Sequence, residues 1–245
     1  ITHTGTEPPY GYMDWWPSSI WFNHEDGPFT EADMRWAVSY SIDRQQLMDV
    51  GLGGSAIMTA LPFPQYPAMQ PYFDAAAPLL EKYNTNEYNP EKAAALMEGM
   101  GYEKDDEGFW VKDGERVPAV LSGWQVFNDI GPLIAEQLRK GGFEAEYTTP
   151  ADTGTRMSDG TQKIWINGHG GSIRDPFRTM DMYTSKYWAP IGEPTSYQSR
   201  FKNAEYDELL AKMATMDPNP EDQEYMDTYL AALEIWLENL VDAPI

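Results

Sequence analysis

The sequence contains no cysteine and little histidine. The absence of cysteine excludes disulfides, thiolate metal sites and cysteine nucleophiles, and it leaves the redox compartment open. The three histidines, His3, His24 and His169, stand far apart in the sequence, and none belongs to a pair at metal-ligand spacing. We therefore expect no metal site.

Positive charge is also scarce, because 17 Lys and Arg residues face 39 Asp and Glu residues and give a net charge of -22. Such a surface repels the phosphate backbones of nucleic acids and anionic membranes, so we expect neither nucleic acid nor a membrane surface as a partner. No apolar run reaches membrane-spanning length. The sequence opens at Ile1 without a signal peptide, which predicts a mature protein or a fragment.

The common catalytic signatures are missing. The sequence has no Gly-x-Ser-x-Gly elbow, no Walker loop and no dinucleotide fingerprint. The acidic segment 104–108 lacks the ligand spacing of a calcium loop and is interpreted as a solvated turn. Carboxylates are so numerous that a glycosidase pair stays open as an alternative, although no pair stands out. We predict no catalytic residue and no cofactor.

Apolar residues make up 42% of the chain and aromatic residues 13%, with nine Trp. This composition supports a sizeable core, and some of the aromatic rings could stack on a flat ligand instead of packing inside. We find no repeat and no linker, so residues 1–245 are predicted to form a single domain.

The first half of the chain predicts a strand at 20–22 and a helix over 30–50. A capping box at Thr30–Asp33 would start this helix, and its buried face would carry Met34, Ala37 and Ser41. The segment 60–84 holds five prolines among aromatics and is interpreted as a long ordered loop. Asn89-Pro90 predicts the start of another helix.

The second half predicts a parallel strand–helix–strand unit. The strands are 117–121 and 143–148, and the apolar face of the helix runs from Ile130 to Leu138. Asp113-Gly114 predicts a hairpin between 109–111 and 117–121. Two helices close the chain, one capped by Asn203 and one that carries Trp236 in the core.

The segment 163–183 organises the candidate site. A short apolar strand is broken by Gly168, Gly170 and Gly171, and Asp175-Pro176 can begin a helix as N-cap and N1. In open α/β sheets ligands bind at the carboxyl ends of strands. Trp124 follows another strand of the same sheet, so its ring is expected at that edge. The candidate ligand-binding residues are Trp124, Asn128, Asn167, His169, Ser172, Arg174 and Asp175.

Two plainer interpretations stay open. The polar residues after the strand can simply face water in a strand-to-helix turn. The ring of Trp124 can pack in the core beneath its loop.

Five segments of the chain carry a resemblance in the right order. They are Phe22-Asn23 through Pro28-Phe29, Met34-Arg35 and Ser39-Tyr40-Ser41-Ile42-Asp43-Arg44; Tyr88-Asn89-Pro90-Glu91-Lys92-Ala93 with Gly101-Tyr102; Lys112-Asp113-Gly114; Gln137-Leu138 with Gly142; and Asn203 with Tyr206-Asp207 and Leu209-Leu210. Together they resemble the extracytoplasmic solute-binding proteins of ABC importers in the peptide, nickel and oligosaccharide class, often called family 5.

The resemblance implies a periplasmic-binding-protein-like α/β lobe, a mixed sheet with a parallel βαβ unit flanked by helices. Family members have two lobes around a cleft, and this chain resembles only the carboxyl-side lobe, so the amino-side lobe would be absent. The implied role is non-catalytic capture of a small-molecule ligand by a periplasmic monomer. The implied partners are the membrane subunits of an ABC transporter.

The resemblance also bears on the ligand. Peptide-binding members carry an aspartate that holds the peptide ammonium group, and Ser172 stands at that position here. Loss of the carboxylate favours an oligosaccharide, which needs hydrogen-bonding groups and a flat aromatic face such as Trp124. The alternatives are an oligopeptide or a metal complex, which the negative charge of the chain favours. A carbohydrate-active enzyme domain is the third interpretation.

Overall fold

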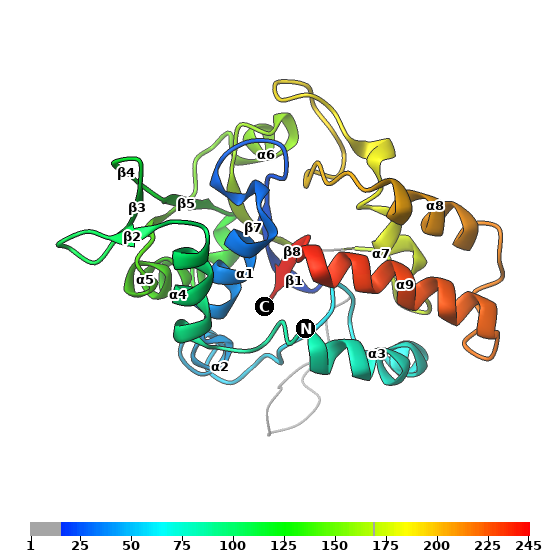
Figure 1. Cartoon of the computed structure of the whole chain (residues 1–245). Helices are drawn as coiled ribbons and strands as arrows, with labels where there is room; N and C mark the ends of the chain where they lie inside the picture. Colours follow the sequence, from blue (N-terminus) through cyan, green and yellow to red (C-terminus); the bar gives the residue numbers. More distant parts are fainter. Residues whose placement is uncertain (1–15, 169) are drawn as a thin grey trace.

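The computed structural model describes residues 16–168 and 170–245. A five-stranded mixed sheet lies at its centre (Figure 1). From one edge to the other its strands are β6 (Glu144–Thr148), β5 (Pro118–Ser122), β7 (Ile164–Gly168), β1 (Ser18–Phe22) and β8 (Asp242–Pro244). β5 is parallel to β6 and β7, whereas β1 is antiparallel to β7 and β8. Four strands therefore run one way and β1 runs against them, which confirms the predicted fold class.

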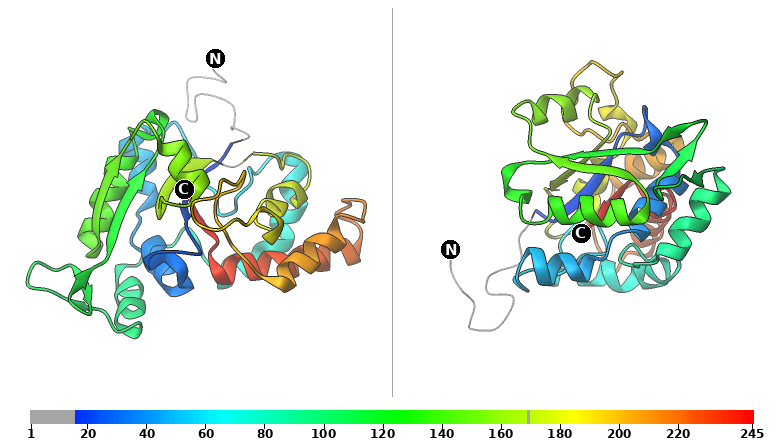
Figure 2. Two further views of the ribbon diagram at one scale, coloured as in Figure 1. Left: turned by 90° about the horizontal axis from the view of Figure 1, so that it is seen from above. Right: turned by 90° about the vertical axis from the view of Figure 1, so that its left-hand side faces the viewer.

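The predicted parallel βαβ unit is present. Helix α5 (Gly131–Gly141) connects β5 to β6 and packs along β6 (Figure 2). Its residues Ile134 and Leu138 are fully buried. The helix ends where Gly142 adopts a left-handed conformation with φ of 100°. Because a Cβ there would lie 2.9 Å from the carbonyl oxygen of Gly108, glycine suits this turn on two grounds.

The two faces of the sheet bury different apolar clusters. Side chains alternate along β1, so successive residues of this strand belong to opposite clusters. Ile20 and Phe22 pack with α1 (Ala32–Tyr40), α4 (Pro90–Gly99) and α5. Trp21 lies on the opposite face, where its ring stacks on Trp165 at 6.2 Å. That face is covered by four helices, seen on the other side of the sheet in Figure 1: α3 (Gln70–Lys82), α7 (Phe177–Asp181), α8 (Ala204–Met213) and α9 (Gln223–Asn239).

A small antiparallel sheet lies beside the main one and consists of β2 (Glu103–Lys104), β3 (Trp110–Lys112) and β4 (Glu115–Arg116). The turn at Asp113-Gly114 forms as predicted, but β3 pairs with β4, and of the predicted partner 117–121 only Val117 bonds to β3, through its amide to the Trp110 carbonyl at 3.1 Å. The latter segment becomes β5 in the main sheet, where its apolar side chains Ala119 and Leu121 are fully buried.

Helix α6 (Thr153–Asp159) was not predicted.

The predicted single helix over 30–50 is wrong. Pro28–Thr30 form a 3-10 turn, so Thr30 cannot serve as N-cap, and α1 begins at Ala32 with Glu31 in that position. The helix stops at Tyr40. The carboxylate of Asp43 then caps a short α2 (Arg44–Gln46), which continues as a π-helical turn over Leu47–Gly51. The predicted buried face is confirmed, because Met34, Ala37 and Ser41 are buried.

The predicted loop over 60–84 is also wrong in its second part, because α3 begins at Gln70 and contains Pro78. Pro71 sits in the first turn, where a missing N–H costs nothing, but Pro78 removes one helical hydrogen bond. Tyr72, Phe73 and Ala76 are buried on one face, and the ring of Tyr72 meets Tyr229 of α9 at 5.6 Å. Burial of this face outweighs the local preference of proline.

Three local predictions are confirmed. The side chains of Asn89 and Asn203 accept hydrogen bonds from the amides of Lys92 (3.0 Å) and Tyr206 (2.9 Å), so both residues cap their helices. Trp236 on α9 is completely buried.

Candidate functional site

The strand register places the carboxyl ends of four strands at one edge of the sheet. Ser18, at the start of β1, lies opposite Gly168 at the end of β7, and Ser19 lies opposite Pro244 at the end of β8. Ser122 at the end of β5 lies opposite Thr148 at the end of β6. The loops that carry the predicted site residues therefore leave the sheet at a common edge, where α/β sheets bind ligands.

Trp124 and Asn167 meet at this edge. The indole N–H of Trp124 donates to Oδ1 of Asn167 at 3.3 Å, which links the loop after β5 to the end of β7. A Cβ at Gly154 would lie 2.8 Å from Cη2 of Trp124, so one side of the indole packs on the backbone of α6. The side chain keeps 42% of its surface exposed. Trp124 is thus not a core residue, and part of its ring can meet a ligand.

Asn128 belongs to the same corner through Tyr147 on β6. The Tyr147 hydroxyl lies within hydrogen-bonding distance of the Trp124 carbonyl (3.1 Å) and of Oδ1 of Asn128 (3.3 Å), and its single proton can be donated to either. Burial raises the pKa of Tyr147 above its ordinary value, so the phenol stays protonated and can donate. The tyrosine ring is held over Gly131, where a Cβ would lie 2.4 Å from Cε2. Tyr147 was predicted only as a strand residue, because its position at the end of β6 depends on the neighbouring loops.

The loop after β7 is held by an internal clamp. The Ser172 amide donates to Oγ1 of Thr179 at 3.1 Å, and the Thr179 amide donates to Oγ of Ser172 at 2.9 Å. Ser172 is 2% exposed, so its hydroxyl serves the loop in this structure. The Asp175 carboxylate accepts from the amide of Phe177 at 3.0 Å, and α7 begins one residue later than predicted. Asp175 thereby fixes the helix start.

Arg174 in this loop is exposed, and His169 lies outside the described residues. Within the described residues, no hydrogen bond or ion pair joins Ser172, Arg174 or Asp175 to the corner formed by Trp124, Asn128 and Asn167. The seven predicted residues therefore fall into two groups, and the role of each in ligand binding stays a prediction.

Two hollows at this edge were not predicted. An apolar groove of about 540 Å³ lies between the loop after α2 and the turn after Trp124. Its walls include Trp16, Met58, Pro64, Val126, Phe127 and Ile245. A second depression of about 650 Å³ lies beside the loop after β7 and is lined by Tyr66, Gly170, Gly171, Ile173, Arg178, Met182 and Tyr197. The aromatic and proline-rich segment 60–84 was a sequence signal for both, because it supplies Pro64 and Tyr66.

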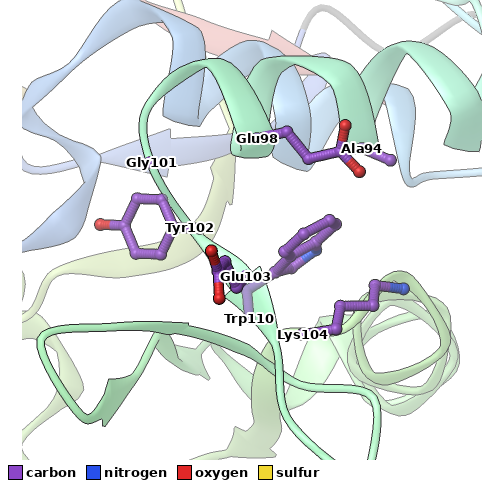
Figure 3. Close-up of a pocket in the computed structure, with 7 residues that line it drawn as sticks. All are labelled: Ala94, Glu98, Gly101, Tyr102, Glu103, Lys104 and Trp110. Carbon is purple, nitrogen blue, oxygen red and sulfur yellow. The ribbon is translucent and has the colours of Figure 1, made fainter.

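A third depression lies on the small sheet, away from this edge (Figure 3). The Trp110 ring in it is covered by the Lys104 ammonium group, 4.8 Å from the ring centroid. The indole N–H of Trp110 donates to the Gly141 carbonyl at 2.8 Å. Because its aromatic ring is already covered and bonded, this depression is a weaker candidate than the edge of the main sheet.

Arg35 and Arg44 belong to the first of the segments that carry the family resemblance, and both have structural roles. Arg35 donates to the carbonyls of Asn239 (2.6 Å) and Phe29 (2.7 Å), and Arg44 donates to the Pro244 carbonyl (2.6 Å). Burial lowers the pKa of Arg35 to about 10 and that of Arg44 to about 9, so both stay charged at neutral pH. They tie α1 and α2 to the segment 239–244.

The described residues contain no group of three or more acidic or histidine side chains arranged to hold a metal ion. In the acidic segment 104–108, Asp105 and Glu107 pair with Arg116 at 2.7 and 2.9 Å. A search of the described helices finds none whose length and apolar character would let it cross a membrane.

Comparison with known proteins places the sequence in a family. The sequence model of the bacterial extracellular solute-binding proteins, family 5 Middle, matches residues 4–190. Heme-binding protein A of Haemophilus influenzae is 27% identical over 194 residues, which are 78% of this chain and 32% of that protein.

Solved structures share the fold. A periplasmic oligopeptide-binding protein of an ABC transporter from Thermotoga maritima, with mannohexaose bound, superposes with a TM-score of 0.84 at 19% identity, over 99% of this chain and 46% of that one. NikZ from Campylobacter jejuni in complex with Ni(L-His) gives 0.75 at 17% identity, over 94% and 44%. The chain thus spans less than half the length of these proteins.

Proposed function

Because the chain belongs to the bacterial extracellular solute-binding proteins of family 5, we propose that it forms one lobe of a two-lobe protein that captures a small solute for an ABC importer. The greater length of the matched structures, of which this chain covers 46% and 44%, supports a second lobe. The protein would act outside the cytoplasmic membrane as a monomer and deliver its ligand to the transporter's membrane subunits without changing it chemically.

The strand edge described above would form one wall of the ligand cleft. The amide of Ile245 donates to the Ser18 carbonyl at 3.0 Å, so the described chain enters and leaves the sheet at this same edge. A second lobe joined through these two segments would face Trp124 and Asn167. Closure of two lobes around a ligand is a common hinge motion.

We propose an oligosaccharide as the ligand class, and the half-exposed Trp124 carries this proposal. Sugars present apolar faces that stack on aromatic rings and hydroxyls that need donors and acceptors. The indole of Trp124 is held in place by Asn167, and the amide of Asn128 lies nearby through Tyr147. The Thermotoga maritima relative was solved with mannohexaose on the same fold, which is consistent with this ligand class.

Calorimetric titration of the complete protein with mannohexaose, cello-oligosaccharides and short peptides tests the proposal. Trp124→Ala should weaken oligosaccharide binding by about 1–3 kcal/mol, a usual cost for a buried interface aromatic. Trp188→Ala is the matched control. The Trp188 indole donates to Glu25 at 3.0 Å, just beyond the opposite end of β1, and its loss should leave binding unchanged.

The alternatives give different results. Tight peptide binding that weakens as salt rises and ignores Trp124→Ala would contradict the oligosaccharide proposal. It would favour an oligopeptide or a cationic metal complex drawn by the net charge of -22. A carbohydrate-active enzyme would shorten the oligosaccharide, whereas a binding protein returns it intact, and chromatography of the recovered ligand separates these two.

A further inference from the structure

The depression beside the loop after β7 is lined by an exposed arginine for which the described residues provide no ion pair or hydrogen bond. Arg178 on α7 lines this hollow together with Tyr66 and Tyr197. Tyr66 directly follows Pro64 and Gln65, which line the apolar groove. The loop 64–66 therefore contributes side chains both to the apolar groove and to this depression.

Nearly all basic side chains of this acidic chain are already engaged. The ion-paired ones are Lys82, Lys92, Arg116, Lys140, Arg156, Lys163, Lys186, Lys202 and Lys212. The others donate to carbonyl groups or cover aromatic rings, as Arg35, Arg44, Lys104, Lys112, Arg139 and Arg200 do. Among the described residues, only Arg174 and Arg178 lack an ion pair, a hydrogen bond and a ring contact, and only Arg178 lines a hollow.

The acidic residues nearest to Arg178 in the sequence, Asp175 and Asp181, have other partners. The Asp175 carboxylate accepts from the amide of Phe177 at 3.0 Å. Asp181, one turn after Arg178, pairs with the Lys186 ammonium at 2.6 Å. Neither of these carboxylates pairs with Arg178 within the described residues, so its exposed guanidinium is accessible to a ligand.

Gly171 leaves the space that the side chain of Arg178 occupies. Gly171 has a φ of 124°, a conformation that residues with a side chain rarely adopt. A Cβ at Gly171 would lie 2.8 Å from Cγ and Cδ of Arg178, so the aliphatic part of the arginine lies across the bare glycine backbone. A larger residue at Gly171 would displace Arg178 from this position.

We propose that the depression receives a carboxylate of the captured solute, which pairs with Arg178 beside the rings of Tyr66 and Tyr197. A guanidinium binds a carboxylate through two parallel hydrogen bonds, which gives both strength and orientation. This inference rests on the proposed capture of a small solute and narrows that solute to one with an acidic group. The carboxylate could belong to an acidic oligosaccharide or to the C-terminus of a peptide.

Matched ligand pairs test the inference by calorimetry on the complete protein. The sugar pairs are mannohexaose and cellotriose, each compared with the aldonic acid made by oxidising its reducing end. The peptide pair is Ala-Ala-Ala compared with its C-terminal amide. In the wild type, the acid should bind about tenfold or more tightly than the neutral partner, the factor expected of hydrogen bonds to a charged group. The pair that shows this preference identifies the source of the carboxylate.

Variants assign the preference to Arg178. Arg178→Gln should abolish it while the neutral member binds as before, and Arg178→Lys should retain part of it. Lys212→Gln removes the same charge from a surface pair with Glu224 and should keep the full preference. Equal affinities for acid and neutral members, in the wild type and in Arg178→Gln alike, would overturn this inference and leave the proposed function standing. Failure of every probe to bind would overturn both.

Discussion

Arg44 offers the sharpest test of how the fold of this chain is held together. Its guanidinium is 1% exposed and donates to the carbonyl of Pro244 on β8 (2.6 Å), the carbonyl of Ser39 (3.2 Å) and the hydroxyl of Ser39 (2.8 Å). β8 is an edge strand that pairs only with β1 among the strands of the described sheet. Arg44 therefore provides the last strand with a second attachment, to the junction of α1 and α2.

The variant Arg44→Met keeps the length and much of the volume of the side chain and removes every donor. The carbonyls of Pro244 and Ser39 then lose a buried partner, and each such loss costs about 1–3 kcal/mol. Part of this cost is offset, because the variant no longer buries a charge, whose desolvation lowers the pKa of Arg44 to about 9. We expect the free energy of unfolding to fall by about 2–4 kcal/mol.

Urea unfolding followed by tryptophan fluorescence measures this loss, and hydrogen exchange locates it. The amide of Ile245, bonded to the Ser18 carbonyl at 3.0 Å, should exchange faster in the variant. Arg156→Met is the control, because Arg156 makes only an exposed pair with Asp152 (2.9 Å), and its loss should change stability by less than about 0.5 kcal/mol. If both variants unfold alike and Ile245 stays protected, Arg44 does not anchor β8.

Three further outcomes are expected. Trp236→Ala should lower the free energy of unfolding in urea by about 3–5 kcal/mol, because the fully buried ring meets Tyr183 at 5.9 Å; Trp236→Phe should lower it less, and an unchanged transition would refute this packing. Desolvation, helped by the charge of Arg35, lowers the pKa of His24 well below 6.5. The unfolded chain therefore binds the extra proton, and the melting temperature should fall as pH drops below about 6.5; His24→Gln should flatten this slope, and an identical slope would exclude the residue. Calorimetry should find that the 245-residue chain binds the ligand of the complete protein weakly, because one wall offers only part of the contacts; equal affinities would contradict the two-lobe proposal.

Several predictions that depend on short stretches of sequence are confirmed, although the capping box at Thr30–Asp33 is wrong. Asn89 and Asn203 cap helices because a short polar side chain reaches the amide three residues ahead, whatever surrounds it. The parallel pairing of β5 with β6 follows from a strand, a short helix and a strand in succession. The segments that carry the family resemblance were also recognisable, although nothing in them indicated that Arg35 and Arg44 bind backbone carbonyls.

Two predictions fail because a distant contact or a competing local hydrogen bond outweighs the local pattern. Five prolines over 60–84 predict a loop, but burial of Tyr72 and Phe73 against the second face of the sheet stabilises α3 in spite of Pro78. A single helix over 30–50 matches the apolar period, yet Asp43 caps a new helix within it. In both places the deciding energy comes from residues far away or from a competing side-chain hydrogen bond.

The candidate site divides in the same way. Sequence alone determined that polar residues follow a buried strand near Trp124, because a run of glycines must end the strand and a parallel sheet gathers carboxyl ends at one edge. Only the tertiary structure decided which of these side chains are exposed and which are engaged within the chain. Ser172 is engaged with Thr179, whereas Arg178, predicted only as part of a helix, lines a depression with no partner in the described chain. The reason is physical: whether a polar group is satisfied depends on what the fold brings within hydrogen-bonding distance, and spacing along the chain does not encode that.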